Sequence, residues 1–183
     1  AVRVEAQGML TQVGLAQVFG PELSPLVRGQ APWQARLLPQ RDGSGLFIEA
    51  DLRDLELRLP APLAKAQGEP LLLQVRTSAT GTDSQVLDLQ LEERVTGKLA
   101  FQRAASGWMF TRGRIGIGEK VTQLPSQSGL QLSARLPVLS ADDWWSLLRQ
   151  NLSGSGDSGW LDRVSRVNAE VESLDAFGRG FGR

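Results

Sequence analysis

The chain has 183 residues, and its 20 Lys and Arg residues balance its 20 Asp and Glu residues. A neutral charge argues against nucleic-acid binding, which usually requires a basic surplus. Because the sequence contains no His and no Cys, it excludes a Ser-His-Asp triad, Cys-His catalysis, disulfides and zinc sites built from these residues. The longest apolar runs have three or four residues, so we expect no transmembrane segment in this chain.

The first predicted element is a short helix. Apolar residues within Met9–Gly20 recur at helical spacing, and the Gly-Pro step that follows ends the pattern. The next run, Leu46–Lys65, alternates apolar and polar residues like a half-buried strand, but its apolar positions change from even to odd numbers. Because this change requires one extra residue, we expect a β-bulge at Asp54, and Pro60 and Pro62 should end the strand pairing.

The middle of the chain repeats a period of two residues, which is typical of β-strands. Short Gly-rich turns at 41–45, 79–83 and 104–107 separate the apolar runs, as antiparallel hairpins require. A second change of phase, within Ser106–Gly118, predicts another bulge at Gly113. The shared apolar face of these strands and of the strand Gly129–Pro137 is predicted to contain Leu87, Leu89, Leu91, Leu99, Phe101, Leu130 and Leu132.

A second helix is predicted over Ser140–Leu152. Ser140 is a suitable N-cap, and an Asp pair in the first turn suits the helix dipole. The Ser- and Gly-rich stretch Asn151–Gly159 is predicted to be a flexible loop. The segment Arg163–Gly178 fits helix and strand spacing alike, and its β-branched residues favour a strand.

The strands are apolar on one face only, and two short helices cannot cover that face on eight or nine strands. The sequence predicts a mainly β fold: residues 1–183 form one segment with a strongly curved antiparallel meander sheet and one or two short helices. The sheet either closes into a sandwich, which the pattern alone favours, or stays open as a groove or half-barrel. Because the chain starts inside an alternating run and ends without a cap, we expect it to be excised from a longer protein.

Other residue clusters have structural explanations. The pair Asp142–Asp143 fits the first turn of a helix, and Glu92–Glu93 fits a solvated strand end. The glycines of Gly113–Gly118 have the wrong spacing for a dinucleotide-binding loop. The five tryptophans fit packing at a core or its boundary better than an aromatic ligand cage. We therefore expect no enzyme activity, no metal site and no cofactor.

The stretch Ile48–Lys65 resembles a recurrent signature of the AsmA-like superfamily, in its YhdP branch. In that signature a strand ending Ser-Asp-Leu-x-Gly-Leu runs into Leu-Pro-x-Pro-Leu and a nearby Lys. The matching residues are Asp51, Leu52, Leu55, Leu59, Pro60, Pro62, Leu63 and Lys65, while Ala50 replaces the Ser and Asp54 the Gly. Leu26–Leu37 resembles the family's Gly-x-x-x-Trp strand, Ser128–Leu148 its strand-then-helix unit, and Leu174–Gly182 the start of its next repeat.

The resemblance implies a periplasmic piece of a bacterial bridge-like lipid-transfer protein, anchored to the inner membrane by a segment outside this chain. Curved sheets of neighbouring repeats would stack into a groove that carries phospholipid acyl chains between inner and outer membranes. This favours the open sheet, with the seven Leu and Phe side chains named above as groove candidates.

The main alternative is a structural or assembly β-sandwich module of a cell-envelope protein, without a ligand. A hydrolase that uses carboxylates is disfavoured, because acids such as Asp88 lie opposite the leucines.

Overall fold

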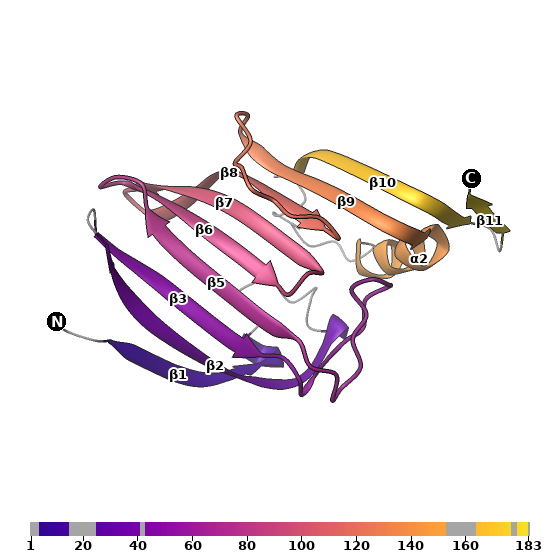
Figure 1. Ribbon diagram of the computed structural model, residues 1–183, viewed down its shortest axis with the longest axis horizontal. Helices are drawn as coiled ribbons and strands as arrows, with labels where there is room; N and C mark the ends of the chain where they lie inside the picture. Colours follow the sequence, from indigo (N-terminus) through magenta and orange to yellow (C-terminus); the bar gives the residue numbers. More distant parts are fainter. Residues whose placement is uncertain (1–3, 15–24, 41–42, 153–163, 177–178, 183) are drawn as a thin grey trace.

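The computed structural model describes residues 4–14, 25–40, 43–152, 164–176 and 179–182. They form an 11-stranded sheet in the order β1-β2-β3-β5-β6-β7-β8-β9-β10-β11, with β4 paired to β2 outside this order. Figure 1 shows the sheet as one continuous layer with β1 and β11 at its two sides. The predicted mainly β fold with a curved sheet is confirmed.

The elements have the following bounds: β1 (Glu5–Thr11), β2 (Val27–Gln40), β3 (Gly43–Asp51), β4 (Leu55–Leu57), β5 (Leu72–Ala79), β6 (Ser84–Leu91), β7 (Val95–Ala104), β8 (Gly107–Ile117), β9 (Gly129–Ser140), α2 (Ala141–Leu152), β10 (Val164–Ala176) and β11 (Arg179–Gly182). The three predicted Gly-rich turns link β2 to β3, β5 to β6 and β7 to β8. Within the segment Arg163–Gly178, residues Val164–Ala176 form a strand, β10, as predicted.

The sheet is mixed rather than an antiparallel meander throughout. The strands from β1 to β8 pair antiparallel with their neighbours, but β9 runs parallel to both β8 and β10. Parallel neighbours need a long connection that returns the chain to the same end of the sheet. The segment 118–128 provides this return before β9, and α2 forms part of the return before β10.

The phase change within Leu46–Lys65 marks a turn between two strands. β3 ends at Asp51, the chain turns, and β4 then pairs with β2. The predicted bulge at Asp54 is therefore wrong, because Asp54 lies in that turn. The turn passes so close to Gly29, which has a φ of 104°, that any side chain there would overlap the Asp54 carbonyl.

The predicted bulge in β8 exists, but two residues before Gly113. The pairing passes from Ala100↔Arg112 to Phe101↔Phe110, which leaves Thr111 as the extra residue. Gly113 has a different role, because an added Cβ would collide with a methyl carbon of its partner Leu99. This glycine makes room for the Leu99 side chain.

The helix α2 begins as predicted. The Ser140 hydroxyl accepts a hydrogen bond of 3.4 Å from the Asp143 backbone N–H. Trp144 is half-buried, and its indole N–H donates to the Ala61 carbonyl at 3.3 Å. Trp145, its neighbour, is 63% exposed. The two tryptophans thus divide between packing and solvent.

Two predicted segments fall partly outside the described residues. Within Met9–Gly20, residues 9–11 belong to β1 and residues 12–14 are helical. Asn151 and Leu152, at the start of the predicted loop, belong to α2. Residues 15–20 and 153–159 lie outside the part of the chain that the structure describes.

The largest buried cluster lies at one end of the sheet, within and beside residues 52–71, which we call the end segment. The cluster consists of Ala31, Ala50, Leu52, Leu55 and Leu71, and side chains of β1, β2, β5 and β6 pack against it. Leu55 and Leu71 are each only 1% exposed. The end segment therefore supplies the three leucines of this cluster, Leu52, Leu55 and Leu71.

Lys65 holds the end segment together from inside. Its ammonium donates to the carbonyls of Leu55 at 2.6 Å, Ala66 at 2.9 Å and Arg53 at 3.0 Å. The residue is 2% exposed, and burial lowers the pKa of its amine below the ordinary value, against the pull of nearby Glu69. A buried ammonium is tolerated here because three carbonyls surround it.

The sheet curves strongly at this end. The hydrogen bond from the Trp144 indole N–H to the Ala61 carbonyl joins α2, which follows β9, to the end segment beside β2. Between β2 and β9 the sheet contains β3, β5, β6, β7 and β8 (Figure 1), so only a curved sheet can make this contact. Because Leu73 and Leu91 pack against the end-segment leucines, the sheet curves toward the side that carries these apolar residues.

Candidate functional site

The strand register places apolar side chains of neighbouring strands opposite one another. The central row contains Ala6, Ala35, Ile48, Val75, Leu89, Gly97, Ile115, Leu132 and Val167. One flanking row contains Trp33, Ala50, Leu73, Leu91, Val95, Ile117, Ala134 and Ala169, and the other contains Leu87, Leu99, Gly113, Leu130 and Val164. We call the side of the sheet with these three rows the apolar face.

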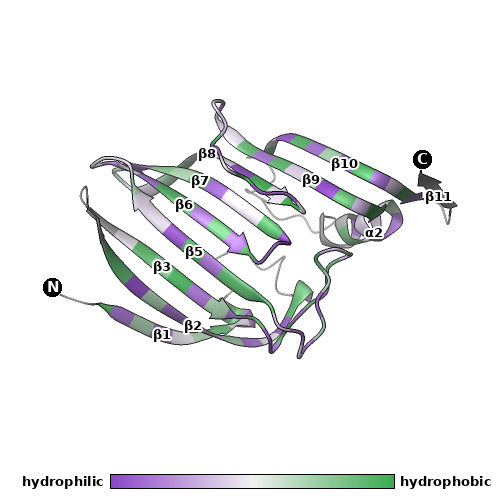
Figure 2. Cartoon of the chain, viewed as in Figure 1, coloured by the Kyte–Doolittle hydropathy of each residue, from purple (hydrophilic) through white to green (hydrophobic). Residues whose placement is uncertain are grey.

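The apolar face is continuous from one side of the sheet to the other. Every residue named in the three rows is apolar or glycine, and every strand from β2 to β10 on the main path contributes to them. Figure 2 shows hydrophobic and hydrophilic residues alternating along most strands, as one-sided strands require. Thr77, which pairs with Leu87, is a polar side chain at this surface, and its hydroxyl accepts a hydrogen bond of 2.9 Å from the Leu46 backbone N–H.

The seven groove candidates all lie on this face. Leu89 and Leu132 are in the central row, Leu91 is in one flanking row, and Leu87, Leu99 and Leu130 are in the other. Phe101 lies one step further along β7 and meets Phe110 edge-on, with ring centroids 5.9 Å apart. All seven side chains are half-buried. The structure brings the candidates together, and their contact with a ligand stays a prediction.

Half-burial distinguishes this face from a packed core. Nine hydrophobic residues are buried in the described part of the chain, and five of them form the cluster at the end segment. A closed sandwich, which the pattern alone favoured, would bury side chains such as Leu89 and Leu132 under a second layer. The described strands instead form a single sheet that leaves these side chains partly open to solvent.

The two ends of the apolar face differ. The end segment packs against one end, while the β7–β8 hairpin lies at the other. A cavity of about 560 Å³ at the hairpin is lined by Phe101, Trp108 and Phe110, among others. Trp108 is 45% exposed, with the Arg103 guanidinium 6.0 Å from its ring. The run Trp-Met-Phe in β8 was the sequence signal for this feature.

The opposite side of the sheet, which we call the polar face, carries a charged row. It contains Glu5, Arg36, Phe47, Arg76, Asp88, Lys98, Arg114, Gln131 and Arg166. The guanidinium groups of Arg36 and Arg76 lie 5.6 and 5.5 Å from the Phe47 ring centroid. This row contains five cations and two acids, although the whole chain is neutral.

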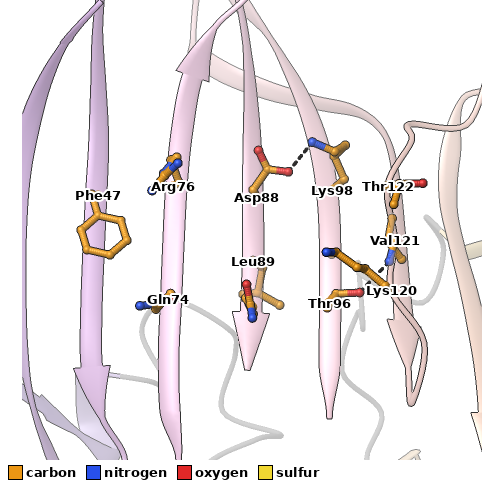
Figure 3. Close-up of a pocket in the computed structure, with 12 residues that line it drawn as sticks. Phe47, Gln74, Arg76, Asp88, Leu89, Thr96, Lys98, Lys120, Val121 and Thr122 are labelled. Carbon is orange, nitrogen blue, oxygen red and sulfur yellow. Dashed lines mark hydrogen bonds and ion pairs between the residues drawn. The ribbon is translucent and has the colours of Figure 1, made fainter. Parts of the chain in front are cut away.

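The connection 118–128 crosses the polar face and encloses a second cavity. The Thr96 hydroxyl donates to the Glu119 carbonyl and accepts from the Val121 N–H, both at 2.8 Å, which fixes the connection against β7. The cavity has a volume of about 400 Å³, and Figure 3 shows residues that line it. Sequence reasoning missed this site, because it assigned residues 118–128 no role.

No helix among the described residues has the length and apolar character needed to cross a membrane. The same part of the chain also contains no group of three or more His, Cys, Asp or Glu side chains arranged to hold a metal ion.

Comparison with known proteins agrees with the sequence motifs. The chain is 25% identical over 157 residues to the intermembrane phospholipid transporter YhdP of Escherichia coli (strain K12). That alignment covers 75% of this chain and 11% of the relative, so the chain spans only a small part of the relative's length. No solved structure matches the chain. The model of the YhdP protein family matches residues 1–183, and the chain therefore belongs to the YhdP family.

Proposed function

We propose that this chain is a segment of a phospholipid-transporting protein of the cell envelope, and that its apolar face holds phospholipid acyl chains. The observation that carries the proposal is the half-buried apolar surface that extends across one curved sheet. The name of the related Escherichia coli protein, intermembrane phospholipid transporter, supports the same assignment.

Elementary energetics support acyl chains as the ligand. Each methylene group that leaves water for an apolar surface gains about 0.8 kcal/mol. Side chains such as Leu89 and Leu132 still expose apolar area, so an acyl chain laid on them completes the burial of both partners. Because the three rows contain no charged group, they hold lipid without fixing its position, and the headgroup stays at the rim in water.

The wider arrangement follows from this role. The segment would work in the periplasm, between the inner and outer membranes, with an inner-membrane anchor outside this chain. Neighbouring repeats of the same protein would extend the apolar face on both sides. Transport of this kind needs no covalent chemistry, and the proposal assigns none to any residue.

A charge placed on the apolar face tests the proposal. Leu89→Asp and Leu132→Asp are each expected to reduce retention of a fluorescent phospholipid at least roughly tenfold, because an acyl chain would have to bury the carboxylate. Gln102→Asp is the matched control, since Gln102 is exposed, lies on the polar face of β7 and is outside the cavity beneath the connection 118–128. It should retain lipid like the unmodified chain. Circular dichroism checks that every variant is folded.

The outcomes separate the two candidate roles. Folded variants that lose lipid support an acyl-chain surface. If the unmodified chain binds no phospholipid and both apolar-face variants unfold, the chain is a structural module without a ligand.

A further inference from the structure

The cavity on the polar face lies outside the proposed acyl-chain surface. It lies between the connection 118–128, which is held against β7, and the polar face of β5, β6 and β7, and its lining includes Gln74, Arg76, Asp88, Lys98, Lys120 and Thr122. The sheet itself separates this cavity from the apolar face. A phospholipid held on the apolar face therefore cannot place its own phosphate there.

The cavity carries excess positive charge. Arg76, Lys98 and Lys120 contribute three cations against the single carboxylate of Asp88. Asp88 is already engaged, because it forms an ion pair with Lys98 across the neighbouring strands. Arg76 and Lys120 are exposed and form no ion pair with any residue that the structure describes. Two cations in the cavity thus remain without a counter-charge.

Arg76 and Lys120 both line the cavity, and both side chains are exposed, so their N–H groups are accessible to a ligand. The Arg76 guanidinium is stacked near the Phe47 ring, which leaves the N–H groups at its edge available. Figure 3 shows Lys120 reaching from the connection back over β7 toward β6, on the side where Arg76 and Lys98 project. The bonds between Thr96 and the connection keep Lys120 in this position.

Neutral donors complete the lining. Thr122 adds a hydroxyl beside the cations, and Gln74 adds an amide whose nitrogen already donates one hydrogen bond, to the Glu49 carboxylate at 2.9 Å. A tetrahedral oxyanion accepts several hydrogen bonds at once, and Arg and Lys are its preferred charged partners. A cavity of about 400 Å³ accommodates a phosphate group with a small substituent such as glycerol.

We propose that the polar-face cavity binds a phosphate group, supplied either as a soluble phosphate compound or as the headgroup of a separate anionic lipid. Arg76 and Lys120 bind the phosphate oxygens, and Lys98 contributes the N–H groups that its pair with Asp88 leaves open. This site is independent of acyl-chain binding on the other face.

The test titrates the 183-residue chain with inorganic phosphate and with glycerol 3-phosphate by isothermal calorimetry, and with phosphatidylglycerol vesicles by flotation. Arg76→Gln and Lys120→Gln should each weaken binding about tenfold, as expected for the loss of one charge-assisted contact. Arg112→Gln removes the same charge from an exposed position on β8 outside the cavity, and it should change the affinity less than twofold.

The arms of the experiment identify the source of the phosphate. Saturable binding of the soluble compounds that depends on Arg76 and Lys120 supports a soluble ligand. Binding to vesicles alone, lost in Lys120→Gln and kept in Arg112→Gln, supports a lipid headgroup. The proposal is overturned if nothing binds, or if Arg112→Gln weakens binding as much as the cavity variants do. Leu132→Asp should leave phosphate binding unchanged, which separates this result from any failure of lipid retention.

Discussion

Leu55→Asp is expected to prevent stable folding, whereas Leu89→Asp is expected to leave the chain folded. Leu55 is 1% exposed within the end-segment cluster, so its replacement buries a carboxylate without a partner. That places the cost at about 4 kcal/mol or more, in the extreme range for single substitutions. Leu89 is half-buried on the apolar face, where a carboxylate reaches water, and the cost should be roughly 1 to 2 kcal/mol.

Thermal unfolding followed by circular dichroism distinguishes the two sites. The expected result is no cooperative transition for Leu55→Asp and a modestly lowered Tm for Leu89→Asp. Equal and severe destabilisation of both variants would show that Leu89 belongs to a packed core, which contradicts an open apolar face.

Lys65→Met is expected to lower the free energy of unfolding by roughly 2 to 4 kcal/mol. Met preserves most of the apolar stem but removes the ammonium, so the carbonyls of Arg53, Leu55 and Ala66 lose a donor each. A net hydrogen bond contributes about 1 kcal/mol, and a buried acceptor left without a partner costs more. Relief of the buried charge offsets part of this loss, because burial disfavours the ammonium.

Urea unfolding measures the effect, with Lys98→Met as the control. Lys98 forms a partly exposed pair with Asp88, and its replacement should cost about 1 kcal/mol or less. If Lys65→Met unfolds at the same urea concentration as the unmodified chain, the ammonium does not hold the end segment together.

The sequence was sufficient to predict features that depend on local pattern. The period of two residues located the strands, because one face of each strand packs and the other meets water. Ser140 with its following acids located the start of α2, because capping is a local interaction. The same alternation predicted that Leu89 and Leu132 lie on one face, and the strand pairing confirms that they share the central row of the apolar face.

Features that depend on partners distant in the chain were not predictable in this way. A turn at Asp54 and a bulge at Asp54 would both move the apolar residues from even to odd positions in the sequence. Only the pairing of β4 with β2 distinguishes the turn from the bulge. The parallel pairing of β9 likewise depends on where the connection 118–128 returns. The polar-face cavity was missed for the same reason, because Arg76 and Lys120 lie far apart in sequence and line one cavity only through the course of that connection.

Photo-crosslinking from the apolar face tests the central claim most directly. A benzophenone amino acid is placed at Leu89 of β6 or at Gln102 of β7, which lie in neighbouring strands but on opposite faces of the sheet, with Gln102 outside the polar-face cavity. After irradiation with phospholipid vesicles, mass spectrometry measures the lipid attached to the chain. An acyl-chain surface predicts a phospholipid adduct from position 89 and little or none from position 102. Equal labelling at both positions, or no adduct at position 89, would contradict it.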